Sequence, residues 1–261
     1  MPAVRFRRVA SGGQVDEGPT CEQQRPIAGQ PVIPLLLSLH SFAMSAAHDS
    51  RNSFLDGPVG VLEAVLWTPV PLAPPKLAAV VCHPHPLFGG TMHNKVVYQA
   101  AKSLDALGIP VLRFNFRGAG KSAGLHDRGI GERDDVRAAL DFLANEFPST
   151  PLLVAGFSFG CWVGLAVGCV DPRVHALIGL GAPVNNSDFS YLRECSKPKL
   201  FIQGQNDEHG DANKLRALVA SLPGDNRLEI IPHADHFFAG QLTHVDHAIT
   251  ASLRRWFTFM V

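Results

Sequence analysis

Short apolar runs alternate with helical patterns from residue 57 to the end of the chain. Continuous apolar runs are typical of strands covered on both faces, and apolar residues spaced three or four positions apart are typical of helices. The apolar runs predict strands over residues 59–69, 77–82, 111–116, 151–155, 174–180, 200–202 and 228–231. The helical spacing predicts helices over residues 96–107, 136–147, 158–170, 215–222 and 242–256. This alternation predicts one α/β domain over residues 57–261, with a mostly parallel central sheet and helices on both faces.

The first 56 residues lack this alternation. Residues 1–30 mix arginines, glycines and glutamines without a period, as is common in segments that need not fold. The apolar stretch 32–39 is short and lies late for a signal peptide, and residues 45–47 match a cleavage site only weakly. We therefore expect residues 1–56 to form an irregular or disordered arm, with an extension upstream of a true start at Met44 as one explanation. On the same grounds, a cytoplasmic location is favoured over secretion.

Composition and charge exclude some classes of protein and leave others without support. Of 261 residues, 46% are apolar and 18% are charged, which is typical of a globular domain and excludes a mostly disordered chain. The 23 basic residues balance the 23 acidic ones, so nothing points to nucleic acid or a membrane as a partner. The 5 cysteines form no C-x-x-C pair, and the 12 histidines show no three-ligand metal spacing. We therefore expect buried thiols rather than a disulfide framework, and neither a metal nor a cofactor.

The strongest chemical signal is the G-x-S-x-G sequence at residues 156–160, which lies between a predicted strand and a predicted helix. A serine on such a sharp turn has strained backbone geometry, and the flanking glycines avoid clashes. The following helix directs N–H groups and its positive end toward a developing oxyanion. This context predicts that Ser158 is a catalytic nucleophile.

A serine nucleophile needs a general base and a carboxylate that orients the base. In this architecture both should follow the serine in the chain, in loops after late strands, with the acid first. Asp207 follows the predicted strand 200–202 and is favoured over its neighbour Glu208, because it lies nearer the strand end. His236 follows the last predicted strand and is the favoured base, with His233 as its rival.

Two backbone N–H groups should form the oxyanion hole. One comes from Phe159, the residue directly after the nucleophile. The other should come from the loop after the predicted strand 77–82, where two prolines provide no N–H. This leaves His85 and Leu87 as candidates, and we choose His85.

Four strings in the chain resemble those of the serine α/β-hydrolases. The resemblance extends over about residues 57–256 and is closest to small, capless bacterial hydrolases related to dienelactone hydrolase and prolyl-oligopeptidase-type catalytic domains. It rests on residues 83–97, 113–122, 156–160 and 236–238. The resemblance implies the α/β-hydrolase fold without a substantial lid domain, and a triad of Ser158, Asp207 and His236. One difference is that dienelactone hydrolases use a cysteine nucleophile, whereas this chain has Ser158.

These observations predict an esterase that acts on small-molecule esters with short acyl chains through an acyl-serine intermediate. A thioesterase or peptidase with the same triad, or a catalytically silent binding protein of this fold, are the alternatives. Arg117, in the second of the four strings, is expected to brace neighbouring loops rather than bind phosphate, because the phosphate-loop spacing is missing. Several phenylalanines are candidates for lining a small apolar pocket, namely Phe88, Phe157, Phe159, Phe237 and Phe238.

Overall fold

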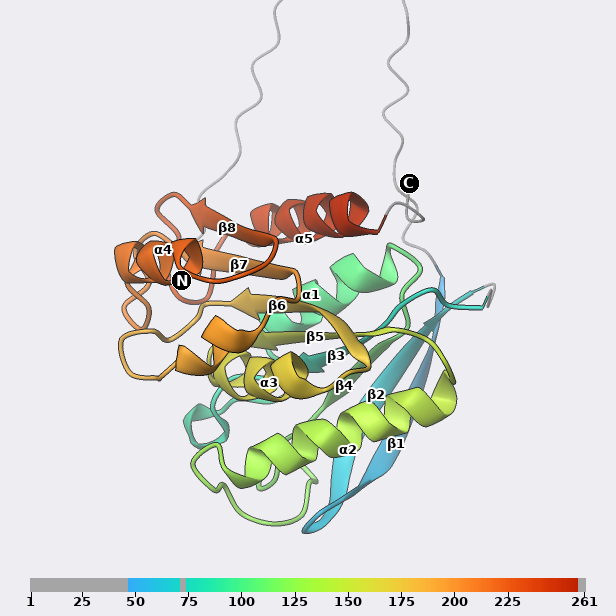
Figure 1. Ribbon diagram of the computed structural model, residues 1–261. Coiled ribbons are helices and arrows are strands. Elements are labelled where there is room, and N and C mark those ends of the chain that lie inside the picture. Colours follow the sequence, from blue (N-terminus) through green and yellow to red (C-terminus); the bar gives the residue numbers. More distant parts are fainter. Residues whose placement is uncertain (1–46, 71–73, 258–261) are drawn as a thin grey trace, which may run out of the picture. The chain divides into compact units, whose positions relative to one another are not determined.

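The computed structural model describes residues 47–70 and 74–257, which form an eight-stranded sheet with helices on both faces (Figure 1). The strands are β1 (His48–Gly57), β2 (Gly60–Pro69), β3 (Ala78–Cys82), β4 (Val111–Phe114), β5 (Leu152–Phe157), β6 (Val174–Leu180), β7 (Lys199–Gly204) and β8 (Asn226–Ile231). Their spatial order is β1-β2-β4-β3-β5-β6-β7-β8. The pairs β1–β2 and β2–β4 are antiparallel, and all other neighbours are parallel. The predicted α/β class with a mostly parallel sheet is therefore confirmed.

Two hydrophobic cores lie on the two faces of the sheet. The helices are α1 (Lys95–Asp105), α2 (Gly131–Glu146), α3 (Phe159–Val170), α4 (Ala212–Ala220) and α5 (Leu242–Trp256), with 3₁₀ turns η1 (Pro86–Phe88) and η2 (Ser190–Glu194). Apolar residues of α1 and α5 pack into one core, and those of α2, α3 and α4 into the other. Alternate residues of β3 enter the two cores, as expected of a strand covered on both faces. Within the described ranges, no helix is long and apolar enough to cross a membrane.

Strand β1 is the main departure from the predicted elements. Residues 48–56, which we assigned to the N-terminal arm, form nearly all of it, so the sheet begins at His48. Its sequence is mostly polar, and Leu55 is its only buried residue. It is a strand because its backbone pairs with β2 along its whole length, a property that hydrophobic periodicity does not report. The rest of the predicted arm, including the stretch 32–39 and Met44, lies outside the described residues.

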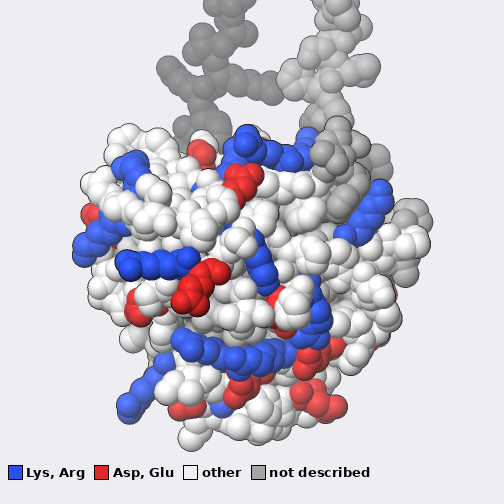
Figure 2. All heavy atoms as spheres, viewed as in Figure 1, with Lys and Arg blue, Asp and Glu red and all other residues white. Residues whose placement is uncertain are grey.

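Charged side chains of both signs are interspersed on the face of the molecule in Figure 2. This mixture matches the equal numbers of basic and acidic residues in the sequence. The parallel strands β3, β5, β7 and β8 all end at the same edge of the sheet, which is where α/β proteins form their sites.

Candidate active site

Ser158 occupies the sharp turn between β5 and α3. Its φ of 54° lies in the left-handed region, which a residue with a side chain adopts only at a cost. A Cβ at Gly156 would lie 2.2 Å from the carbonyl oxygen of Gly160, and one at Gly160 would lie 2.5 Å from the carbonyl oxygens of Cys82 and His83. The turn therefore requires glycine at both positions, as the motif predicted.

The structure brings Asp207 and His236 to Ser158 from the loops after β7 and β8. His236 Nε2 lies 2.9 Å from Ser158 Oγ, and His236 Nδ1 lies 2.8 Å from Asp207 Oδ2. The side chains of both Asp207 and His236 are buried. The three groups form a continuous hydrogen-bonded chain from a buried carboxylate to an accessible hydroxyl.

The Asp207 carboxylate is held by several donors besides His236. Its Oδ2 accepts from Gln203 Nε2 at 2.8 Å, and its Oδ1 accepts from the backbone N–H groups of His209 at 2.8 Å and Gly210 at 3.1 Å. Because four donors converge on the two oxygens, the carboxylate acts as an acceptor, and the His236 proton lies on Nδ1. His236 Nε2 is then free to accept the hydroxyl proton of the serine.

Glu208 and His233, the alternative acid and base, lie outside this hydrogen-bonded chain. The Glu208 carboxylate is mostly exposed, and its ion-pair contact is with His209 Nε2 at 3.7 Å. His233 is exposed, and its backbone N–H donates to Gln205 Oε1. Neither one takes part in the chain of hydrogen bonds that ends at Ser158.

The two expected oxyanion donors lie in the same cleft as Ser158. Phe159 is the first residue of α3, so its N–H has no acceptor within the helix. The N–H of Leu87 donates to His85 Nδ1 at 3.2 Å and is therefore already used. The N–H of His85 donates to no acceptor in the described part of the chain. Hydrogen bonding thus favours His85 over Leu87.

His83 anchors the loop that carries His85, a role that sequence reasoning missed. Its Nδ1–H donates to the Pro84 carbonyl oxygen at 2.6 Å, and its Nε2 accepts from the Phe116 N–H at 2.9 Å. Burial lowers the pKa of His83 to about 4, so the imidazole is neutral near pH 7. Sequence reasoning also missed Gln203, which donates to the Asp207 carboxylate. Its only signal in the sequence was a polar side chain at the end of an apolar strand.

The loop between β4 and α2 is braced as expected. The Arg117 guanidinium donates to both carboxylate oxygens of Asp135 near the start of α2, and its backbone N–H donates to Asp135 Oδ2. This hydrogen bonding raises the pKa of Arg117. Buried Glu132 accepts from the N–H groups of Asp127 and Gly129 in the same loop. The guanidinium is therefore committed to a structural ion pair.

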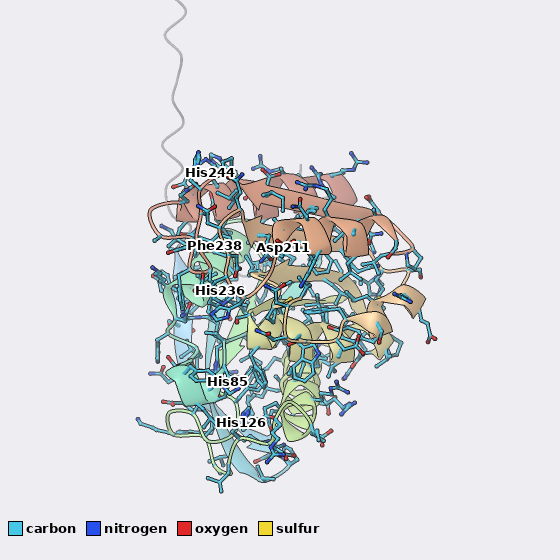
Figure 3. The ribbon with its side chains drawn as sticks, turned by 90° about the vertical axis from the view of Figure 1, so that its left-hand side faces the viewer. His85, His126, Asp211, His236, Phe238 and His244 are labelled. Carbon is cyan, nitrogen blue, oxygen red and sulfur yellow. The ribbon has the colours of Figure 1, made fainter. Side chains whose placement is uncertain are left out.

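A cleft of about 620 Å³ opens above Ser158. Figure 3 shows His236, His85 and His126 in succession on the side of the molecule that faces the viewer. The lining includes many rings, and the His85 ring lies 4.9 Å from that of Phe159 and 4.5 Å from that of His126. The residues that line the cleft are Pro84, His85, Phe88, Gly89, Gly90, Asn94, His126, Arg128, Ser158, Phe159, Trp162, Pro183, Asn186, Ser187, His209, His236 and Phe237.

Three of the five candidate phenylalanines line this cleft, namely Phe88, Phe159 and Phe237. The other two, Phe157 and Phe238, are fully buried in the core between the sheet and the α1–α5 layer. Over the described ranges, no group of three or more His, Cys, Asp or Glu side chains could hold a metal ion.

Comparisons with known proteins agree with this fold. Residues 79–255 match the family model described as an alpha/beta hydrolase domain. A crystal structure from Xanthomonas campestris, described as an α/β serine hydrolase without lid, is 38% identical, covers 80% of this chain and 95% of its own, and has a TM-score of 0.74. An uncharacterized protein of Rickettsia prowazekii is 39% identical over 75% of this chain and 85% of its own length. The monoacylglycerol lipase of Mycolicibacterium smegmatis is 29% identical over 55% of this chain and 50% of its own.

Proposed function

Since this chain belongs to the α/β serine hydrolases, we propose that it cleaves carboxylic esters with short acyl chains through a covalent acyl-serine. The observation that carries the proposal is the hydrogen-bonded chain of Ser158, His236 and Asp207 beside a cleft. A buried carboxylate that fixes the tautomer of an imidazole in contact with a hydroxyl is the arrangement that acyl transfer requires.

In the proposed mechanism, His236 Nε2 takes the Ser158 proton as Oγ attacks the ester carbonyl. The N–H groups of Phe159 and His85 donate to the oxyanion, each contributing about 10²–10³ in rate. His236 then gives its proton to the leaving alcohol, and Asp207 stabilises the imidazolium that forms in between. Water, deprotonated by the same imidazole, releases the acid and restores Ser158.

The size of the cleft supports small substrates. Between β6 and β7 the chain forms only the 3₁₀ turn η2, so this segment supplies no helical lid. A cleft of about 620 Å³ with an aromatic lining accommodates an acyl group of modest length beside an alcohol. We therefore expect a preference for acyl groups around acetate to hexanoate, and no jump in rate when the substrate forms droplets.

A second candidate substrate is a monoacylglycerol. Phe88, which lines the cleft, is 87% exposed, and its neighbour Leu87 is 69% exposed, so apolar surface lies next to the cleft and is available to a longer acyl chain. One relative is named for monoacylglycerol lipase activity. Thioesters and peptides are further alternatives for the same triad.

The test separates catalysis from substrate choice. A fluorophosphonate probe should label the protein on Ser158, and the Ser158→Ala variant should remain unlabelled while keeping its circular dichroism spectrum. Absence of labelling in the unmodified protein would contradict the proposed nucleophile and favour a silent binding protein.

Substrate choice is then measured as kcat/KM over p-nitrophenyl esters from acetate to palmitate, together with a monoacylglycerol, an acyl thioester and an aminoacyl amide. We expect the highest values at short chains. A higher kcat/KM for palmitoyl than for butyryl esters would contradict the short-chain preference and favour the glyceride.

A further inference from the structure

Lys199, the first residue of β7, is fully buried. Its Nζ donates to the carbonyl oxygens of Cys195 at 2.5 Å, Lys197 at 2.7 Å and Pro223 at 3.0 Å. In the described part of the chain, no Asp or Glu side chain forms an ion pair with it. An ammonium in this position is costly unless an anion lies nearby. The ionisable groups that act on Lys199 electrostatically are the thiols of Cys195 and Cys169.

The 195–199 segment, which begins with Cys195, is attached to the end of α3, where Cys169 lies. Cys169 lies in the last turn of α3 and is half-buried, and Cys195 directly follows η2 and is buried. Lys197 Nζ donates to the carbonyl oxygens of Gly168 at 2.7 Å and Asp171 at 2.5 Å, on either side of Cys169. The segment is therefore fixed beside the cysteine of the helix.

The surroundings favour a thiolate at one of the two positions. Hydrogen bonding from the Cys169 thiol, a bond from the Lys197 backbone and the charges of Lys199 and Lys197 lower the pKa of Cys195. The hydrogen bond to Cys195 raises the pKa of Cys169. A thiolate beside a thiol and a cation is the arrangement in which cysteines react with oxidants when solvent reaches them, and here the half-buried Cys169 gives that access.

We propose that Cys169 and Cys195 form a redox modification site, at which a peroxide converts the two thiols into a disulfide. The Cys195 sulfur attacks one peroxide oxygen, the O–O bond breaks, and a sulfenic acid and water form. The Cys169 sulfur then attacks the sulfenic sulfur, the S–O bond breaks, and the second oxygen leaves as water with the Cys169 proton. Two thiols and one hydrogen peroxide thus give one disulfide and two waters, and two electrons pass from sulfur to peroxide.

The molecule contains its own control pair. Cys82 and Cys161 are fully buried in the core, and Cys161 also feels the Cys82 thiol electrostatically. Burial raises the pKa of both, and no lysine acts on either one. These thiols should therefore stay reduced under conditions that oxidise Cys169 and Cys195, although they too are two cysteines near each other.

The experiment maps the cysteines after oxidation and needs no activity assay, so it stands apart from the proposed function. The experiment uses the full chain with Cys21→Ser, which removes the cysteine outside the described residues. The protein is treated with hydrogen peroxide at pH 7 and then denatured in the presence of iodoacetamide, which alkylates every thiol that is still free. It is digested without reductant. We expect one peptide pair joined through Cys169 and Cys195, two hydrogens lighter and released by dithiothreitol, with Cys82 and Cys161 alkylated. Sulfinic acid on Cys195 with Cys169 still alkylated, both cysteines alkylated throughout, or a cross-link involving Cys82 or Cys161 would overturn the proposal.

Two variants test the roles of Cys169 and Lys199 separately. Cys169→Ser in the same background should give no cross-link and should accumulate oxygen on Cys195 instead, because the second thiol is missing. Lys199→Gln removes the buried charge and should slow cross-linking about tenfold at pH 7, since less Cys195 is thiolate. An unchanged rate in a folded Lys199→Gln protein would contradict the proposal, and if this variant does not fold, peptide mapping of the Cys21→Ser protein decides.

Discussion

Replacing Gly160 with alanine tests how closely the serine turn must approach the loop after β3. A Cβ at this position would lie 2.5 Å from two backbone carbonyl oxygens, those of Cys82 and His83, whereas ordinary contacts begin at 3.4 Å. Backbone atoms cannot rotate away as a side chain does. The start of α3 must therefore move away from the end of β3 by most of the difference between these two distances.

This movement would separate the two proposed oxyanion donors, because Phe159 begins α3 and His85 belongs to the loop after β3. A misplacement of roughly 1 Å costs about 10²-fold in rate, which is about 2.7 kcal/mol of transition-state stabilisation. Overpacking should also lower the free energy of unfolding by about 1–3 kcal/mol, offset in part by the better helix propensity of alanine. We expect kcat/KM to fall about 100-fold and the melting temperature to fall by roughly 5 °C.

Gly164→Ala is the matched control, one turn further along α3. Its Cβ would meet side-chain atoms, Cys82 Sγ at 3.0 Å and Val154 Cγ1 at 3.2 Å, which can shift by a few tenths of an ångström. Both variants are assayed with p-nitrophenyl butyrate and by thermal unfolding. Gly164→Ala should stay within about threefold of the unmodified kcat/KM, since the oxyanion donors do not move. If Gly160→Ala retains more than a tenth of the activity, or if the two variants behave alike, the argument from backbone contact is wrong.

The remaining predictions address the proposed triad, acid stability and the N-terminal segment. Asp207→Asn should lower kcat by about 10³–10⁴ at nearly unchanged KM, because the wrong His236 tautomer would face Ser158; a loss below tenfold in steady-state kinetics would contradict the role of Asp207. The pKa of His83 is 6.5 in the unfolded chain and about 4 in the folded protein. Between these pH values the unfolded chain binds a proton that the folded protein does not bind. The free energy of unfolding should therefore fall by about 3 kcal/mol between pH 6.5 and 4. Urea unfolding at both pH values should show a smaller fall in His83→Gln, and equal falls would refute this assignment. A chain that begins at Met44 retains all of β1 and should fold and hydrolyse esters like the full chain; insoluble protein would show that earlier residues are needed.

The sequence by itself determined the α/β architecture of this protein and the position of its candidate nucleophile, Ser158. Hydrophobic periodicity is a local property, so it located β3, α3 and α5 to within a few residues. The G-x-S-x-G turn is also local, because its backbone geometry depends on five consecutive residues. The pattern did not predict the polar strand β1, because β1 is a strand only through its pairing with β2, and this pairing is not a local property.

Tertiary structure alone decided which neighbours complete the site. Adjacent residues such as Asp207 and Glu208 have the same chemistry and the same place in the chain, and only the donors that converge on Asp207 separate them. The choice of His85 over Leu87 likewise depends on which N–H is already bonded. These hydrogen bonds depend on how segments far apart in the sequence pack together, and a local sequence pattern does not report that packing.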